Sequence, residues 1–417
     1  MKASERVLSP RLRMFVLAVT FAGLLFDGLE MGLMPVASLS VSKSLLGAAY
    51  TETLGGEWFA RFTAALMLGA AVGGILLGQL GDRIGRARAM GVSILFYSVF
   101  AGLGGFVNSQ EQMLLLRFLV GLGAGGMWPN GVALASECWP NASRPLIAGI
   151  VGAGINAGYL LLSLVALNWH VTPDSWRWLF QWAALPAALG FIALFFLPES
   201  PKWVAQRQAA KAPAPPLREL FQPELVRTTL VGIALGAVPL VGAWAASKWM
   251  VPWADKVGGA TEPCYKALTT FCWGIGATLG SLCGSPLTAW VGRRVAYFAI
   301  SIGATTLTCG LFTLTAPLQP GFLPMVCAQG FVATLFFGWL PLCLPELFPT
   351  RVRATGSGMA YNTGRFATAV GVFFSGSLFV ALGGSYSRVG AVTSMIYALG
   401  MVVIWFAPKT SRRTLEE

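Results

Sequence analysis

The sequence predicts an all-α membrane protein with about twelve transmembrane helices in two pseudo-symmetric six-helix bundles. Hydrophobic residues make up 55% of the 417 residues and charged residues only 11%, whereas a soluble domain carries about a quarter charged residues. The apolar residues form blocks of about 20 or more, the length at which a helix crosses about 30 Å of hydrocarbon. Two polar loop motifs also recur half a chain apart, which indicates an internal repeat.

The apolar blocks place six spans in each half of the chain. In the first half the predicted spans are 13–39, 57–80, 88–107, 110–135, 145–167 and 176–197. In the second half they are 225–252, 265–290, 294–315, 320–344, 354–382 and 388–407. The 50 glycines are expected where membrane helices pack backbone to backbone.

A stretch rich in Ala and Pro with interspersed charges, QRQAAKAPAPPLREL at 206–220, separates the halves and is typical of a linker. We predict an N-terminal bundle at 1–198, a cytoplasmic linker at 199–224 and a C-terminal bundle at 225–417. Two bundles joined in this way are typical of a transporter whose binding site lies at the midplane between them.

The net charge of +12 predicts a membrane topology and not nucleic-acid binding. Basic residues gather before the first span, in the even-numbered loops (for example at 83–88 and 293–294) and after the last span. The positive-inside rule then places both termini in the cytoplasm, and the first span is too long to be a signal-peptide core. We expect a multi-pass monomer in a bacterial inner membrane.

The repeated loop motifs carry a family resemblance. ECWPNASR (137–144) and ELFPTRVR (346–353) share the pattern E-x-x-P-x-x-x-R, and GQLGDRIGRARA (78–89) pairs with SPLTAWVGRRVA (285–296). GQLGDRIGRARA resembles the loop between helices 2 and 3 of the major facilitator superfamily, and PESPKW (198–203) is similar to the end of helix 6 in its sugar porter branch. The resemblance spans the whole chain and implies the major facilitator fold.

The same resemblance implies a cytoplasmic gate. Asp82, with Arg83 and Arg86, would help to latch the two bundles on the cytoplasmic face when the binding site opens outward. In the second copy of the motif Ala289 takes the place of Asp82. Other charges of these loops would complete the network: Glu137, Arg144, Glu199, Arg293, Glu346 and Arg353. The alternative is that all of them are solvated loop charges.

Few ionisable residues lie at membrane depth, and each costs about 2.5–3.5 kcal/mol or more, so each indicates function by default. They are Asp27, Glu30, Arg117, Lys248 (near the end of its predicted span) and Arg365. Asp27 and Glu30 stand three residues apart and share one helix face. That face must point into the bundle or into a wet cavity.

Glu30 and Arg117 both fall in the outer half of the membrane by their depth in the predicted spans. Sugar porters carry a helix 1 G-[YF]-D whose Asp pairs with a helix 4 Arg and handles the coupled proton. Gly28-Leu29-Glu30 and the Arg of RFLVGLGAGG (117–126) occupy these places. The resemblance implies that Glu30 carries a proton, tuned by Arg117, with Asp27 as a second proton site or a partner for Arg365. A static ion pair between the two helices is the alternative.

The stretch D-G-L-E (27–30) resembles the helix 1 motif D-G-x-[DE] of the aromatic acid:proton symporters and the related synaptic vesicle 2-like proteins. Those symporters also carry a Gly-Arg in helix 11, matched by NTGRF (362–366). Arg365 falls near mid-membrane, and its planar guanidinium suits a carboxylate. We therefore predict an anionic substrate anchored by Arg365. The alternative is a permanent ion pair between Arg365 and Asp27 or Glu30.

Further polar and aromatic residues could line the cavity, because small-molecule sites combine apolar walls with a few placed polar groups. The candidates are Trp128, Asn130, Asn156, Trp244, Trp273, Gln329, Trp339, Tyr361 and Asn362. Ordinary helix packing is the alternative for each. The sugar branch is disfavoured, because GIALGAVPLVGAW (232–244) lacks its Gln-Gln motif and Pro341 stands where its helix 10 Trp would fall.

The sequence thus predicts a symporter that imports a small organic anion with protons. The alternatives are a sugar or sugar-acid transporter, an uncoupled facilitator, a drug exporter, or a transporter-like receptor that binds without moving solute. The scattered cysteines show no metal-site spacing, and no nucleophile–base pair appears within the spans. We therefore predict no metal or cofactor and no enzymatic activity. The expected partners are the anion, protons and the lipid bilayer.

Overall fold

The computed structural model describes residues 8–139, 144–208, 217–349 and 352–408. Within these ranges all regular elements are helices. Twelve helices or groups of consecutive helices are long and apolar enough to span a membrane. The predicted all-α class and the predicted number of spans are therefore confirmed.

The first half of the chain holds six spans and one short surface helix. Serine and threonine side chains cap several of them: Thr51 accepts from the amide of Leu54, and Ser109 from that of Gln112. The first five spans are α1 (Pro10–Leu46), α2 (Glu52–Ile84), α3 (Arg86–Leu103), α4 (Gln110–Cys138) and α5 (Arg144–Asn168). The sixth span is made of α6 (Arg177–Trp182) and α7 (Ala187–Phe196), and the short surface helix is α8 (Pro201–Gln208).

The second half holds the other six spans, and its first span is irregular. A π-helical turn (Gly242–Ala246) and a 3₁₀ turn (Ser247–Trp249) stand between α9 (Val226–Val241) and α10 (Met250–Gly258), and the four together form the seventh span. The remaining helices are α11 (Tyr265–Val291), α12 (Arg293–Leu314), α13 (Phe322–Cys343), α14 (Arg353–Ala381), α15 (Tyr386–Ser394) and α16 (Ile396–Val403).

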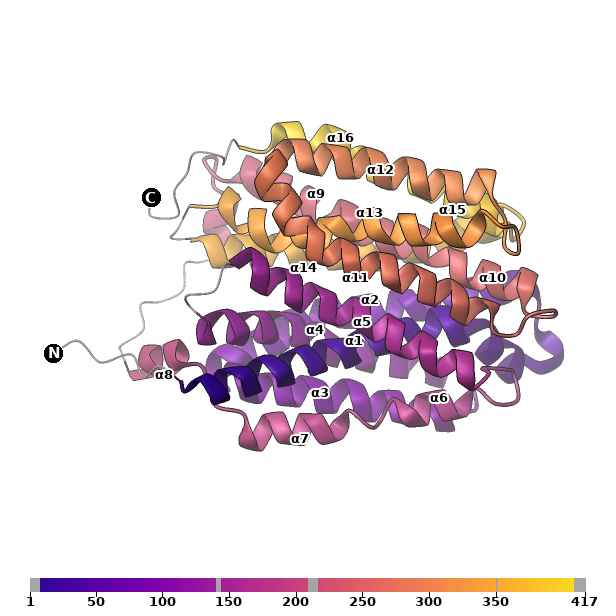
Figure 1. Cartoon of the computed structure of the whole chain (residues 1–417), viewed down its shortest axis with the longest axis horizontal. Helices are drawn as coiled ribbons and strands as arrows, with labels where there is room; N and C mark the ends of the chain where they lie inside the picture. Colours follow the sequence, from indigo (N-terminus) through magenta and orange to yellow (C-terminus); the bar gives the residue numbers. More distant parts are fainter. Residues whose placement is uncertain (1–7, 140–143, 209–216, 350–351, 409–417) are drawn as a thin grey trace.

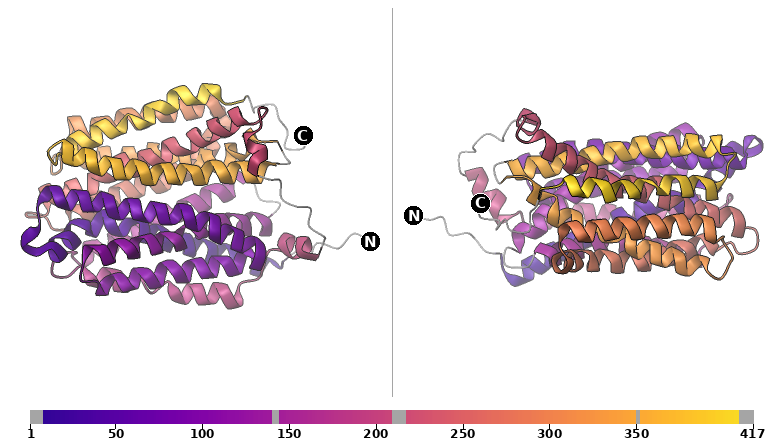
Figure 2. Two further views of the ribbon diagram at one scale, coloured as in Figure 1. Left: turned by 180° about the vertical axis from the view of Figure 1, so that it is seen from behind. Right: turned by 90° about the horizontal axis from the view of Figure 1, so that it is seen from above.

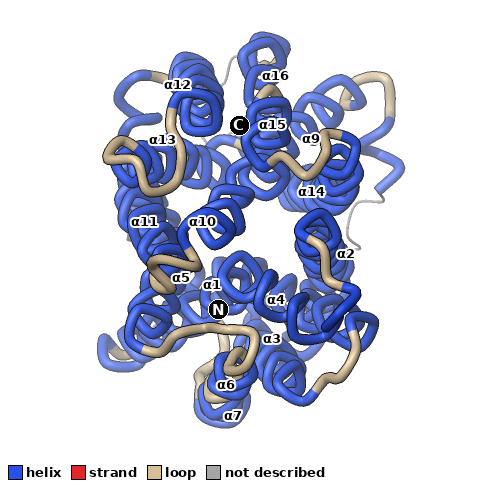
Figure 3. The backbone as a smooth tube through the Cα atoms, turned by 90° about the vertical axis from the view of Figure 1, so that its right-hand side faces the viewer, coloured by secondary structure: helices blue, strands red, loops and turns tan. Residues whose placement is uncertain are grey.

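The helices form two bundles, α1–α7 and α9–α16, that lie side by side (Figure 1). The left view of Figure 2 shows the same two bundles from behind. Figure 3, which looks along the helices, shows where the bundles meet: α5 packs along α11, and α2 packs along α14. The start of α1 and the end of α16 lie at the same end of the molecule, on the left of Figure 1. Which side of the membrane this end faces stays a prediction.

The repeat in the loop motifs also appears in the backbone. Gly85 links α2 to α3 with φ 113° and ψ 151°, and Gly292 links α11 to α12 with φ 97° and ψ 147°. Both conformations lie in a region that is essentially restricted to glycine. The two halves therefore make the corresponding turn in the same way, with a glycine at the matched position of each motif.

Several helix ends lie beyond the predicted boundaries. α1 continues to Leu46 although the prediction ends it at 39, and the seventh span continues to Gly258 although the prediction ends it at 252. Ser38, Ser40 and Ser42 are buried, so these polar residues face neighbouring helices and not the membrane surface. The predicted end of α1 was too early because it was drawn at polar residues that the fold buries.

Candidate functional site

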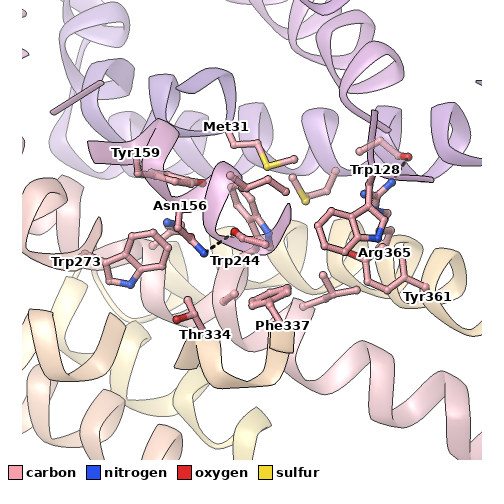
Figure 4. A pocket seen from close by; sticks show the side chains of 17 residues that line it. Met31, Trp128, Asn156, Tyr159, Trp244, Trp273, Thr334, Phe337, Tyr361 and Arg365 are labelled. Carbon is pink, nitrogen blue, oxygen red and sulfur yellow. Dashed lines mark hydrogen bonds between the residues drawn. The ribbon is translucent and has the colours of Figure 1, made fainter. Parts of the chain in front are cut away.

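A small cavity of about 80 Å³ lies between the two bundles, at the level of the buried charges. Helices of both bundles line it: Met31 of α1 and Trp128 of α4 come from one, and Phe337 of α13 from the other (Figure 4). Six of the ten predicted substrate-contacting residues border it: Trp128, Asn156, Trp244, Trp273, Tyr361 and Arg365. That any of these six residues contacts a substrate stays a prediction.

Arg365 reaches from α14 into the facing bundle. Its side chain is buried, and Nη1 donates hydrogen bonds to the carbonyl oxygens of Ala70 and Gly125, both at 3.2 Å. The guanidinium lies 5.0 Å from the centre of the Tyr361 ring. Gly74 leaves room for this approach, because a Cβ there would lie 2.7 Å from Oδ1 of Asn362 and 3.0 Å from Nη1 of Arg365.

The free edge of this guanidinium faces no protein acceptor. Both bonds come from Nη1, so Nε and Nη2 donate to no residue that the structure describes. No described carboxylate forms an ion pair with Arg365. The predicted alternative, a permanent pair with Asp27 or Glu30, is therefore absent from this conformation, and a guanidinium edge suited to a carboxylate borders the cavity.

Asp27, Glu30 and Arg117 are all buried, with at most 1% of each residue exposed. The expected ion pair between Glu30 and Arg117 is not formed. Instead the Arg117 guanidinium lies 5.2 Å from the centre of the Phe180 ring. The carboxylates of Asp27 and Glu30 have no hydrogen-bond partner among the described residues, and the three guanidinium nitrogens of Arg117 have none either. Buried charges normally require such partners.

Lys248 borders the cavity, although the sequence indicated no part for it in substrate binding or proton transfer. The predicted span ended shortly after it, whereas the observed span runs on to Gly258 and places Lys248 well inside. Its side chain is buried and borders the cavity. The ammonium lies 3.3 Å from the centre of the Trp273 ring and 3.9 Å from that of Tyr159. Its place within an apolar run marks it as a membrane-depth charge, but its predicted position near the end of the span gives no reason to place it at the binding site.

The other four predicted contact residues do not border the cavity. Gln329 lies behind it, where its Oε1 accepts from Nε1 of Trp273 at 3.1 Å. Asn130 donates to two backbone carbonyls, those of Leu77 and Gly126. Trp339 donates to the carbonyl of Arg293 at 2.8 Å, and Asn362 lies against α2 at Gly74. Each of these four side chains contacts backbone or another side chain. For these residues the structure therefore favours the predicted alternative, ordinary helix packing, over contact with a substrate in the cavity.

The predicted gate residues form networks inside each bundle. In the first bundle Asp82 pairs with Arg86 at 2.7 Å, Glu199 accepts from the amides of Arg86 and Ala87, and Glu137 accepts from the hydroxyl of Ser200. In the second bundle Arg293 donates two bonds to Glu346, at 2.9 and 3.0 Å. Arg83 is exposed, and the side chains of Arg144 and Arg353 lie outside the described part of the structure.

No ion pair among the described residues joins the bundles at this end. At the opposite end the bundles do touch. Nζ of Lys266 (α11) donates to Oγ of Ser40 (α1) at 3.2 Å, and the ring centres of Phe59 (α2) and Trp249 lie 5.1 Å apart. These contacts hold the bundles together at the end that carries the α1–α2 and α10–α11 turns. At the other end Asp82, Glu137, Glu199, Arg293 and Glu346 form no ion pair with a described residue of the facing bundle, and a latch through Arg144 or Arg353 stays a prediction.

The family comparison agrees with this architecture. The family model described as "Major Facilitator Superfamily" matches residues 16–372. The chain belongs to the major facilitator superfamily. This chain is also similar in fold to a solved D-xylose-proton symporter, with a TM-score of 0.74 over 96% of this chain and 100% of the other at 18% identity.

Two relatives of this major facilitator protein are more similar in sequence. The protein named "Probable 4-methylmuconolactone transporter" of Cupriavidus pinatubonensis is 31% identical over 85% of this chain and 82% of its own length. The "Cis,cis-muconate transport protein" of Acinetobacter baylyi is 28% identical over 90% of this chain and 92% of its own length. The predicted family and the predicted resemblance to its aromatic acid transporters are confirmed, and the protein is a multi-pass membrane transporter and not an enzyme.

Proposed function

We propose that this transporter imports a small organic carboxylate together with protons, by rocking its two bundles about the central cavity. The observation that carries the proposal is the Arg365 guanidinium, which borders the cavity with its Nε–Nη2 edge unpaired among the described residues. A guanidinium edge binds a carboxylate through two parallel hydrogen bonds. The relative named for transport of muconate, a carboxylate, supports an anionic substrate.

Asp27 and Glu30 are the proposed proton carriers. Both are buried and have no hydrogen-bond donor among the described residues, so the ionised form of either would carry a large desolvation cost in this conformation. When the bundles tilt and water or Arg117 reaches the carboxylate, that cost falls and the proton can leave. An anion with one proton crosses without net charge, and each additional proton gains about 2.3 kcal/mol per 100 mV of membrane potential.

The proposal is tested first by substitution of Arg365. The purified full chain in proteoliposomes is expected to take up a labelled aromatic or aliphatic monocarboxylate when the outside is acidic, and to make the outside medium more alkaline. Arg365→Ala is expected to weaken carboxylate binding about 10- to 100-fold, the effect of losing a charged hydrogen-bond partner. Arg365→Lys keeps the charge without the planar edge and should fall between the two.

Arg388→Ala, at an exposed position on α15, is the matched control and should bind and transport as the parent does. Uptake without any change in outside pH would contradict proton coupling and favour an uncoupled facilitator. Ligand binding without filling of the liposomes would instead favour a receptor. Equal carboxylate affinity in Arg365→Ala and the parent would contradict the anchoring role of Arg365.

A further inference from the structure

Lys248 is a second cation at the cavity, and neither carboxylate binding by Arg365 nor proton transfer by the two acids makes use of it. Only 4% of the residue is exposed, and it borders the cavity. It forms no ion pair or hydrogen bond with any residue in the described ranges. The rings of Trp273, Tyr159 and Trp244 surround its ammonium, which lies 5.7 Å from the centre of the last of them.

The backbone around Lys248 is built to hold it there. The π-helical turn at Gly242–Ala246 and the 3₁₀ turn at Ser247–Trp249 shift the register of the seventh span just before and at Lys248, and π-helical turns occur often at functional sites. The hydroxyl of Ser247 is 3.0 Å from that of Tyr397 and accepts from Nε2 of Gln329 at 2.6 Å.

Gln329 also fixes the ring on which the ammonium rests. Its Oε1 accepts from Nε1 of Trp273 at 3.1 Å, and its Nε2 donates to Thr308 at 3.1 Å. One buried amide therefore ties the turn that carries Lys248 to the indole beneath its ammonium. This network satisfies Gln329 and Ser247 within the protein, whereas Lys248 borders the cavity.

Aromatic faces attract an ammonium, but this attraction offsets only part of the cost of removing the charge from water. No described acid supplies the missing partner. Asp255 pairs with Lys266 at 3.1 Å, and neither Asp27 nor Glu30 bonds to a described donor. An anion in the cavity would complete the coordination of Lys248.

Arg365 and Lys248 stand at opposite ends of this cavity. Figure 4 shows Arg365 with Tyr361 and Trp128 on one side, and Trp273 and Tyr159, the rings under the lysine, on the other. Met31, Trp244 and Phe337 lie between these two groups in Figure 4, and Met67, Ile155 and Leu240 also line the cavity. The arrangement is one cation at each end of a mostly apolar passage, whose polar lining residues include Asn156 and Thr334.

We propose that Lys248 is a second anchor for substrate and that the preferred substrate is a dicarboxylate with an apolar body, one carboxylate on Arg365 and the other on Lys248. This inference rests on the proposed carboxylate function of the same cavity. It predicts selectivity, because a monocarboxylate satisfies Arg365 and leaves the lysine without an anion, whereas a dicarboxylate satisfies both cations.

The test compares acids that differ by one carboxylate: terephthalate with benzoate, and hexanedioate with hexanoate. Binding to the purified full chain is followed by the quenching of tryptophan fluorescence and checked by calorimetry. The parent should bind each diacid about tenfold or more tightly than its monoacid. Lys248→Met should remove this preference by weakening the diacids and leaving the monoacids within about twofold of the parent. Lys248→Arg should keep part of the preference.

Lys256→Met, the same substitution at an exposed position of α10, is the control and should behave as the parent. Retained monoacid binding in Lys248→Met also shows that the variant is folded. Equal affinity of the parent for diacids and monoacids, or an unchanged diacid preference in Lys248→Met, overturns the second anchor and leaves the carboxylate function standing. If the parent binds none of the four acids, both proposals are overturned.

Discussion

Three of the membrane-buried cations of this transporter share a feature at the scale of single residues: each lies against an aromatic ring, and none forms an ion pair with a described acid. Arg117 lies over Phe180, Lys248 over Trp273, and Arg365 over Tyr361. A ring holds a cation in place without satisfying its hydrogen bonds. Each of the three is therefore positioned and still free to bind an anion or a carboxylate that arrives during transport.

Glu30→Gln tests the proton-carrying role at this scale. The substitution keeps the size and polarity of the side chain and removes the titratable group, so it should abolish accumulation of substrate against its gradient when a pH gradient is the driving force. Exchange of labelled for unlabelled substrate should persist, because exchange requires no net proton movement. Both are measured in proteoliposomes with an inward proton gradient.

Glu224→Gln, at an exposed position before α9, is the matched control and should accumulate substrate as the parent does. A Glu30→Gln protein that reaches the parental accumulation ratio with the same pH response would rule out Glu30 as the coupling carboxylate. Coupling would then have to rest on Asp27, for which Asp27→Asn provides the same measurement.

For single residues, the sequence predicted which charges are buried better than it predicted which neighbours their side chains contact. It identified Asp27, Glu30 and Arg117 as buried charges, since an ionisable group within an apolar block must face the inside of the bundle to avoid lipid. It did not predict that Arg117 would face Phe180, because the partner of a long side chain depends on which helix packs beside it. It also assigned Gln329 to the substrate although Gln329 holds Trp273.

At the scale of elements, the matched loop motifs require the same backbone conformation in both halves of the chain. Gly85 and Gly292 both adopt a positive φ between two helices. Their surroundings differ: a Cβ at Gly85 would lie 2.1 Å from Oε2 of Glu199, whereas a Cβ at Gly292 meets nothing within 4 Å. The first glycine is therefore required by both conformation and contact, and the second by conformation alone.

We therefore expect Gly292→Ala to lower the free energy of unfolding by about 1–3 kcal/mol, the usual cost of a non-glycine residue in such a conformation. Gly85→Ala should cost more, because it also displaces the Glu199 carboxylate that accepts from the amides of Arg86 and Ala87. Thermal unfolding of the purified variants in detergent measures which substitution destabilises the protein more. Gly310, at a helical position with only Leu314 nearby at 3.8 Å, is a suitable control for Gly→Ala. Equal effects at all three sites would contradict a special backbone requirement at the two turns.

The irregular turns of the seventh span could not be predicted from the local sequence. Pro239 stands inside α9, which indicates an irregular helix, but neither its type nor its position follows from the proline. The π-helical turn begins three residues later, at Gly242, and Ser247, the residue that follows the turn, bonds to Tyr397 and Gln329. Because those partners lie on other helices, the turn is a product of the packed bundle.

At the scale of the whole molecule, transport requires the bundles to move relative to each other, and the α5–α11 contact is where this movement can be blocked. Nδ2 of Asn156 (α5) donates to Oγ of Ser281 (α11) at 2.7 Å. A Cβ at Gly152, one turn earlier on α5, would lie 3.7 Å from the Cβ of Ser281. This separation matches that of a disulfide, about 3.8 Å on average.

We expect the double variant Gly152→Cys/Ser281→Cys to form a disulfide on oxidation and to lose transport, because the bond ties the two bundles together. A reducing agent should restore the activity that the double variant shows before oxidation. The exposed Cys283 lies close by in the chain, so the experiment uses a Cys283→Ser background. Transport that continues at full rate in the cross-linked protein would show that α5 and α11 do not separate during transport.

The single variants Gly152→Cys and Ser281→Cys in the same background are the controls, and oxidation should change the transport of neither. Non-reducing electrophoresis after cleavage of the chain between α5 and α11 reports how much of the protein is cross-linked. Loss of transport in the single variants on oxidation would point to a native cysteine and not to the bundle interface.

The sequence by itself determined the class of this protein, its twelve spans, its internal repeat and the charges that the membrane must hide, because the cost of burying polar groups in lipid leaves few alternatives. The tertiary structure decided which charges meet and which cavity they border. It left Glu30 and Arg117 without an ion pair, placed Lys248 at the cavity and brought the bundles into contact at one end of the molecule. These outcomes depend on helix rotation and on contacts between residues far apart in the chain, and no local pattern encodes them.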